Sequence, residues 1–180
     1  LTRDATSKGA DYDVVVIGGG TSGVAAGIES ARGGATTLIA EEHEWLGGML
    51  TSAGVSATDG NFKLKGGIWG EFRDSLVARY GSEKSLATGW VSNILFEPSV
   101  GDKIFKNIAA KERLLSILYG TYFLSAEKAG EGWSVTLNSN GQIIKIKTKI
   151  LIDATELGDV AKACGVKYEI EKKKKSVTGE

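Results

Sequence analysis

The sequence is poor in the residues that build several common kinds of site. It contains one cysteine, Cys164, and one histidine, His43. A single cysteine cannot form an internal disulfide, and these two residues cannot complete the four-ligand sites typical of zinc. One histidine in a loop after a strand also argues against a Ser-His-Asp hydrolase. We therefore expect no metal centre and no such triad.

Charge of one sign is also lacking, since 22 basic and 22 acidic side chains give a formal net charge of zero. This balance indicates no nucleic-acid partner. The apolar runs are far shorter than the roughly 18 residues of a membrane-spanning helix, so we expect no membrane partner. No secretory signal is recognisable, which favours a cytoplasmic protein. Because the chain begins at Leu1 rather than Met, export with a removed signal is the alternative.

Proline occurs once, whereas glycine occurs 25 times in 180 residues, about twice its usual share. Fourteen of these glycines lie between Gly18 and Gly70. A collagen-like helix is excluded because the glycines show no three-residue period. The apolar share of 42% and the charged share of 24% are ordinary for a globular protein. Glycine concentrated in this way indicates backbone that lies close to another group.

The first part of the chain predicts a strand, a helix and a second strand. Residues 1–11 are polar and aperiodic, which indicates a flexible tail. The β-branched run at 12–17 predicts a strand buried on both faces, and 21–32 carries an apolar helical stripe. With a further strand at 36–40, residues 12–42 form a βαβ unit with a right-handed crossover.

The later part predicts helices followed by a change to strand periodicity. Residues 43–118 form a loop and helix region, with one helix ending at Gly81 and another starting at Pro98. Alternating apolar residues and an Asn-Gly type I′ turn predict a β-meander at 119–148. A closing strand and short helix are expected at 149–165.

Together these elements predict an α/β fold, with a Rossmann-like central parallel sheet and an inserted antiparallel β-meander. The domain is expected to span 12–168. Residues 169–180 form a charged C-terminal segment that we interpret as solvated surface.

The turn after the first strand reads GGGTSG and satisfies G-x-G-x-x-G between a strand and a helix. Gly18 permits the tight turn, Gly20 lets a pyrophosphate approach the backbone, and Gly23 lets the helix pack closely. The helix N-terminus, with Thr21 and Ser22 in its first turn, presents N–H groups and partial positive charge. We expect a nucleotide ligand, and the absence of a following Gly-Lys-Ser/Thr excludes a Walker A loop.

An acidic residue ends the second strand. Glu41 lies 23 residues after Gly18, where its carboxylate can accept both hydroxyls of an adenosine ribose. Glu42 is the alternative, and we favour Glu41 because it comes first after the strand. Nicotinamide enzymes, flavoproteins and many methyltransferases share this arrangement, so the acid alone does not identify the nucleotide.

Two further stretches discriminate among these classes. The sequence WLGGM at 45–49 contains a second glycine pair, which lets another backbone segment pass close to an extended ligand. The sequence ILIDATELGD at 150–159 follows the meander and ends in small residues. Its end is expected at the carboxyl edge of the parallel sheet, where ligands bind.

The motifs VVVIGGGTSGVAAG, Glu41, WLGGM and ILIDATELGD, in this order, resemble the FAD-dependent oxidoreductases of the glutathione-reductase-like FAD-binding superfamily. The resemblance covers almost all of 12–168 and is closest to the bacterial group known simply as FAD-dependent oxidoreductase. It implies FAD as cofactor and hydride transfer between a small-molecule substrate and FAD. It also implies a substrate domain beyond this chain, so we expect an N-terminal FAD-binding portion, completed by the rest of a longer chain or by a partner subunit.

The resemblance also implies which residues bind the cofactor. These are Gly18, Gly20, Thr21, Ser22, Gly23, Glu41, Glu42, Gly47, Gly48, Met49, Leu124, Ala154 and Thr155. Residues 47–49 would run along the pyrophosphate and ribityl side, and Leu124 would present backbone to adenine. Ala154 and Thr155 would close over the dinucleotide. Glu156 stands where many relatives have glycine, so close backbone approach is not expected there.

No residue is assigned a catalytic role. Cys164 is interpreted as a small core residue, and His43 as a surface residue near the adenosine end. Asp59, Lys63 and Arg73 are interpreted as solvated charges, with the alternative that they face the flavin or substrate. An NAD-dependent dehydrogenase and a non-catalytic dinucleotide-binding subunit are the alternative functions. A methyltransferase would leave LGGM and DATELGD unexplained.

Overall fold

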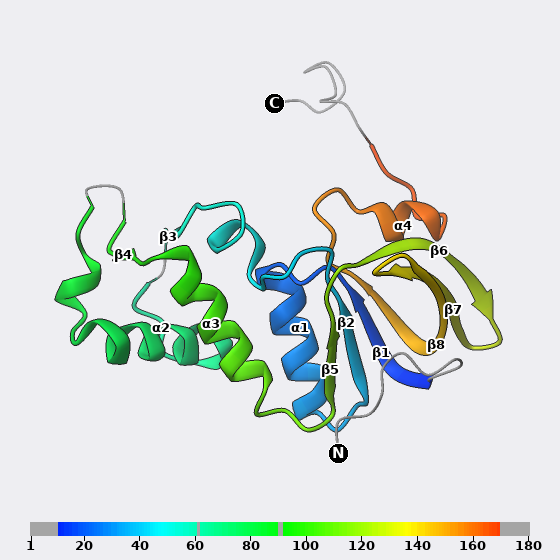
Figure 1. Ribbon diagram of the computed structural model, residues 1–180, viewed down its shortest axis with the longest axis horizontal. Coiled ribbons are helices and arrows are strands. Elements are labelled where there is room, and N and C mark those ends of the chain that lie inside the picture. Colours follow the sequence, from blue (N-terminus) through cyan, green and yellow to red (C-terminus); the bar gives the residue numbers. More distant parts are fainter. Residues whose placement is uncertain (1–10, 61, 90–91, 170–180) are drawn as a thin grey trace, which may run out of the picture.

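The computed structural model describes residues 11–60, 62–89 and 92–169. Its centre is a six-stranded sheet with the order β5-β2-β1-β8-β7-β6 (Figure 1). The strands are β1 (Asp11–Ile17), β2 (Thr37–Ala40), β5 (Leu115–Leu118), β6 (Thr121–Ala129), β7 (Gly132–Ser139) and β8 (Gln142–Asp153). The first four in that order pair in parallel, and β8, β7 and β6 pair antiparallel. The predicted α/β fold with a Rossmann-like sheet and a meander is confirmed.

The βαβ unit has the expected form. Helix α1 (Thr21–Arg32) has the predicted bounds, and β2 starts one residue later than expected. One face of the parallel strands packs against α1, and the other packs against the curled meander and its neighbours (Figure 1). Strands β1 and β2 are largely buried, which agrees with their runs of apolar residues. At Gly27, α1 lies so close that a Cβ would stand 2.5 Å from Cδ1 of Ile39.

One expectation about the strands is wrong. The return strand of the meander and the closing strand expected from residue 149 are a single strand, β8. Its first part pairs antiparallel with β7, and its last part pairs in parallel with β1, as far as Asp153 opposite Ile17. The apolar pattern changes from alternating to continuous where the pairing of β8 passes from β7 to β1, although Ile150 remains 54% exposed.

The predicted hairpin turn connects β7 to β8 within the meander. Asn140 has a φ of 49° and Gly141 a φ of 85°, the two positive values that a type I′ turn requires. Short helix α4 (Asp159–Ala163) follows β8 and lies over β6 (Figure 1). Its Val160 joins the buried cluster between the meander and the parallel strands.

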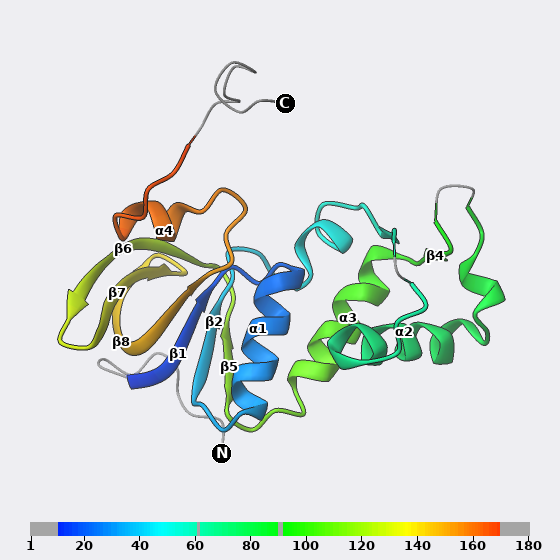
Figure 2. The same ribbon diagram turned by 180° about the vertical axis from the view of Figure 1, so that it is seen from behind.

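A helical lobe, built from residues 57–109, lies beside α1 on the side away from the meander (Figures 1 and 2). Its elements are β3 (Ala57–Thr58), α2 (Gly67–Tyr80), the 3-10 helix η2 (Lys84–Leu86), β4 (Ile94–Leu95) and α3 (Pro98–Ala109). Both predicted helices are confirmed, and Gly81 ends α2 with a φ of 87°. The rings of Phe72 and Phe105 stack with centroids 4.4 Å apart, which joins α2 to α3.

Parts of two predicted segments lie outside the described residues. These are 1–10 of the tail, whose last residue Asp11 belongs to β1, and 170–180 of the charged C-terminal segment. Within the described ranges, no helix has the length and apolar character needed to cross a membrane.

Candidate functional site

The glycine-rich turn joins β1 to α1 at the carboxyl edge of the parallel strands. Gly18 has a φ of 101°, and a Cβ there would stand 2.4 Å from the carbonyl oxygen of Ala154. A Cβ on Gly23 would stand 1.8 Å from the carbonyl oxygen of Gly18. Any side chain at either position would therefore displace backbone, so both positions require glycine.

Gly20 is different, because neither its conformation nor its protein neighbours require glycine. Its φ of −62° is open to any residue, and no atom of the described residues lies within 4 Å of its Cβ position. Gly20 is the N-cap residue of α1, and no side-chain hydrogen bond caps the helix there. The N–H groups of the first turn lack partners within the helix, and the helix dipole makes this end positive. A bare, positive backbone surface fits a pyrophosphate.

Glu41, the first residue after β2, is 8% exposed and faces the turn. Its Oε2 accepts the N–H of Gly19 at 2.5 Å, and its Oε1 accepts the N–H of His43 at 2.8 Å. Each carboxylate oxygen has two acceptor positions, so both retain capacity for a ribose hydroxyl. The Glu42 side chain is exposed, and of the two acids it is Glu41 that faces the turn.

The second glycine pair lies directly against the first turn. The N–H of Gly47 donates to the carbonyl of Gly19 at 2.8 Å, and Oγ1 of Thr21 donates to the carbonyl of Gly47 at 3.0 Å. A Cβ on Gly48 would stand 3.0 Å from the Cα of Gly20. Two stretches that are distant in the sequence therefore form one continuous backbone surface.

Helix α3 holds this second segment through two residues that the sequence analysis missed. Oδ1 of Asp102 accepts the N–H of Leu46 at 2.8 Å. Nζ of Lys106 donates to the carbonyl of Glu44 at 2.6 Å and to Oδ2 of Asp102 at 2.9 Å. The signal in the sequence was an acid and a base four residues apart on an otherwise apolar helix face.

The loop after β8 approaches the turn from the other side. The N–H of Ala154 donates to the carbonyl of Ile17 at 2.9 Å. Oδ1 of Asp153 accepts the N–H of Thr155 at 2.9 Å and its Oγ1 at 2.6 Å, and Oδ2 accepts the N–H of Ala161 at 2.7 Å. Burial raises the pKa of Asp153, but these hydrogen bonds outweigh it and leave the pKa below its usual value. Asp153, also missed from sequence, holds this loop in place.

Leu124 lies at a β-bulge in β6. Phe123 and Ser125 have partners on β7, whereas the register places no β7 residue opposite Leu124. Strand β6 starts beside Glu41, where the N–H of Thr121 donates to the carbonyl of Glu41 at 2.9 Å. Since β6 is an outer strand of the sheet, the bulge leaves backbone groups available near that acid.

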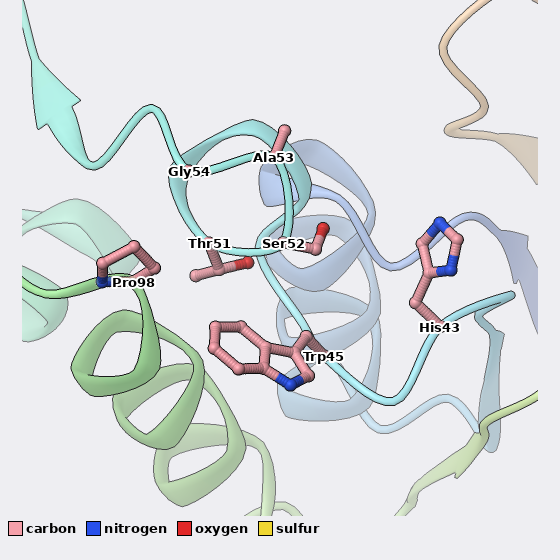
Figure 3. Close-up of a pocket in the computed structure, with 7 residues that line it drawn as sticks. All are labelled: His43, Trp45, Thr51, Ser52, Ala53, Gly54 and Pro98. Carbon is pink, nitrogen blue, oxygen red and sulfur yellow. The ribbon is translucent and has the colours of Figure 1, made fainter.

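A surface pocket of about 600 Å³ borders the second glycine segment. It is lined by His43 and Trp45, by the 51–54 turn and by Pro98 of α3. Figure 3 shows the Trp45 ring below the turn, between Pro98 and His43. The expectation that His43 is an exposed loop residue is confirmed, and its backbone N–H donates to Glu41.

The remaining candidate residues lie in other surroundings. Cys164 packs against the buried cluster of the meander, and burial together with the Asp153 charge raises the pKa of its thiol. Asp59 and Lys63 are exposed. The interpretation of Arg73 as a solvated charge is wrong, because it is 7% exposed and paired with Glu83 within the helical lobe. Across the described residues, no group of three or more His, Cys, Asp or Glu is arranged to hold a metal ion.

The sequence matches a protein-family model and several known proteins. A family model described as FAD dependent oxidoreductase matches residues 13–180. Over 168 residues the chain is 28% identical to digeranylgeranylglycerophospholipid reductase of Methanocaldococcus jannaschii, a match covering 87% of this chain and 41% of that protein. A second match is 42% identical over 68 residues to NADH:fumarate oxidoreductase of Klebsiella pneumoniae, covering 37% of this chain and 7% of that protein.

A solved structure shares the fold. The geranylgeranyl bacteriochlorophyll reductase-like protein of Thermoplasma acidophilum has a TM-score of 0.62 at 18% identity, over 88% of this chain and 43% of that chain. The chain therefore spans less than half the length of the reductase relative and of this structure.

Proposed function

The chain belongs to the FAD dependent oxidoreductase family, whose cofactor is FAD, and on this premise we propose that its two glycine segments and Glu41 bind the adenosine diphosphate half of FAD. The observation that carries the proposal is the bare backbone at Gly20, at the positive end of α1 and beside the Glu41 carboxylate. A pyrophosphate placed there would accept the N–H groups of Thr21, Ser22 and Gly23.

The other residues of the site take the outer parts of the cofactor. Glu41 would accept the ribose hydroxyls with the acceptor positions that its backbone contacts leave, while the exposed Glu42 would serve only at the rim. The backbone at the Leu124 bulge would face the adenine. Ala154 and Thr155, held by Asp153, would close over the dinucleotide beside the turn.

Gly47 and Gly48 would line the cofactor between its pyrophosphate and its flavin. Met49, whose side chain is 64% exposed, would lie beside the ribityl chain. This order of contacts supports placing the chain in the glutathione-reductase-like FAD-binding superfamily.

For the whole protein we propose oxidoreduction of a small-molecule substrate. FAD supplies the redox chemistry, because its ring system accepts and donates a hydride. The residues of this chain bind and orient the cofactor. The relatives bear the names of a phospholipid reductase and a fumarate oxidoreductase, so the shared residues fit a common cofactor better than a common substrate.

Titration of the chain with FAD and with NAD, followed by flavin fluorescence and thermal shift, tests the proposal. FAD is expected to bind, and Gly20→Val is expected to weaken binding by about 100-fold or more, since its side chain would occupy the phosphate position. Its unfolding midpoint should stay near that of the parent because the Cβ position at Gly20 is open.

The matched control is Gly66→Val. Gly66 is also an N-cap glycine with negative φ and an open Cβ position, but it lies at α2 in the helical lobe. It should retain the parent affinity. Full FAD affinity in Gly20→Val would refute the pyrophosphate placement, and binding of NAD without FAD would favour the nicotinamide-dependent alternative.

A further inference from the structure

Helix α3 touches the second glycine segment at residues 44, 46 and 47. Lys106 donates to the carbonyl of Glu44, and Asp102 accepts the N–H of Leu46. At the next residue, a Cβ on Gly47 would stand 2.7 Å from the ring of Phe105. The segment therefore contacts α3 at several positions just before it meets the glycine-rich turn.

On its other side, the second glycine segment is bonded to the glycine-rich turn through Gly47. Leu46, fully buried, donates to α3, and Gly47 donates to the carbonyl of Gly19. Gly47 also has a φ of 104°, a conformation that favours glycine. The residue bonded to α3 and the residue bonded to the turn are thus neighbours in the chain.

The acceptor of the Leu46 N–H is a buried carboxylate, Asp102, which is paired with the partly exposed Lys106. Asp102 is 9% exposed, and its second oxygen is neutralised by Lys106 at 2.9 Å. Lys106 also lies 5.2 Å from the centre of the Tyr119 ring. Burial raises the pKa of Tyr119 to about 12, with the negative charges of Asp102, Glu44 and Glu41 adding to the effect. All three carboxylates act electrostatically on Tyr119, and Lys106 is a cation beside the same ring.

We propose that Asp102 and Lys106 are positioning residues for FAD, which set the second glycine segment from α3 and so couple the helical lobe to the cofactor site. Neither side chain needs to touch the cofactor. The inference rests on the proposed function of the two glycine segments. It predicts that the pair acts on FAD affinity through the order of residues 44–48.

The test compares Asp102→Ala, Asp102→Asn, Lys106→Met and Lys106→Arg with Lys103→Met as control, because Lys103 lies on the exposed face of α3. Each full chain is titrated with FAD, and amide hydrogen exchange of peptides covering 44–50 is measured without FAD. Asp102→Ala and Lys106→Met should weaken FAD binding by about tenfold and raise exchange at 44–50.

The conservative variants separate positioning from general stability. Asp102→Asn keeps an acceptor for the Leu46 N–H but turns a donor toward Lys106, so its loss of affinity should be smaller than that of Asp102→Ala. Lys106→Arg should restore most of the affinity lost in Lys106→Met, and Lys103→Met should leave both readouts unchanged. Asp102→Asn and Lys106→Met carry the test if Asp102→Ala does not fold.

Two results would overturn the inference. One is parent-like FAD affinity in Lys106→Met and Asp102→Asn, with Gly20→Val still unable to bind. The other is a loss of affinity accompanied by faster exchange throughout the chain rather than at 44–50. If Gly20→Val retains affinity, the proposed function itself fails, which is a distinguishable outcome.

Discussion

Oε2 of Glu41 accepts the backbone N–H of Gly19 at 2.5 Å, which ties the end of β2 to the glycine-rich turn at the end of β1. The other oxygen of Glu41 accepts the N–H of His43. Glu41, which is expected to bind the ribose hydroxyls, thus also holds two backbone segments in place. Removing it should affect both the shape of the site and its contacts with ligand.

Glu41→Gln should weaken FAD binding by about tenfold and lower the free energy of unfolding by about 1 kcal/mol. The glutamine amide keeps one acceptor, but its NH₂ group would face one of the two backbone N–H donors. Glu41→Ala should lose more of both. FAD titration and urea unfolding measure the two effects.

Glu42→Gln is the control for that pair, because it removes the same charge from the exposed neighbouring side chain. Its affinity should stay within about twofold of the parent. A larger loss in Glu42→Gln than in Glu41→Gln would move the ribose contact to Glu42.

Alanine at Gly20 and at Gly27 should separate ligand binding from packing. Gly20→Ala places its methyl group in open space, so stability should hold while FAD affinity falls. Gly27→Ala drives a methyl group to 2.5 Å from Cδ1 of Ile39, and overpacking should cost about 1–3 kcal/mol despite the better helix propensity of alanine. Thermal unfolding with and without FAD distinguishes them, and equal stabilities of the two variants would contradict this assignment.

The Asp153 carboxylate should stabilise the fold only at pH values above its titration range. Its folded pKa lies below the unfolded value of about 3.9, so the contribution is complete above that value and disappears as pH falls through the folded pKa. Asp153→Asn should therefore lose about 1–2 kcal/mol at pH 7. The gap between the two melting temperatures should narrow below about pH 4.

Asp159→Asn controls for the loss of one negative charge near α4, because the Asp159 side chain is exposed. Its effect at pH 7 should be smaller than that of Asp153→Asn. A gap between the Asp153→Asn and parent melting temperatures that is constant from pH 3 to 8 would show that Asp153 does not act through its charge.

Arg32 links α1 to the helical lobe, and we expect this link to stabilise the fold. Its guanidinium bonds both oxygens of Glu71 on α2, at 2.6 and 2.9 Å, and also reaches Glu112. Arg32→Met should cost about 1 kcal/mol, less at high salt because the side chains are partly exposed. Arg32→Lys should recover only part, since lysine cannot make the two parallel bonds. Urea unfolding at low and high salt checks both statements.

Local residue patterns were enough to predict the βαβ unit, both long helices and the type I′ hairpin. These features depend on periodicity and on glycine at particular positions, which act over a few neighbouring residues. The continuity of β8 could not be predicted in this way, because its pairing with β7 and then with β1 depends on parts of the chain that are distant in sequence. Arg73 was misjudged for the same reason, since its burial comes from packing in the helical lobe.

The amino-acid order alone was sufficient to predict a nucleotide site at Gly18–Gly23, because a strand, a glycine turn and a helix N-terminus lie within one short stretch. It could not indicate that Glu41 bonds Gly19, or that Asp102 bonds Leu46 from 56 residues away. Such pairs form only when packing brings separate elements together, and no local periodicity records which elements will meet. The tertiary structure therefore decided how the two glycine segments are held as one surface.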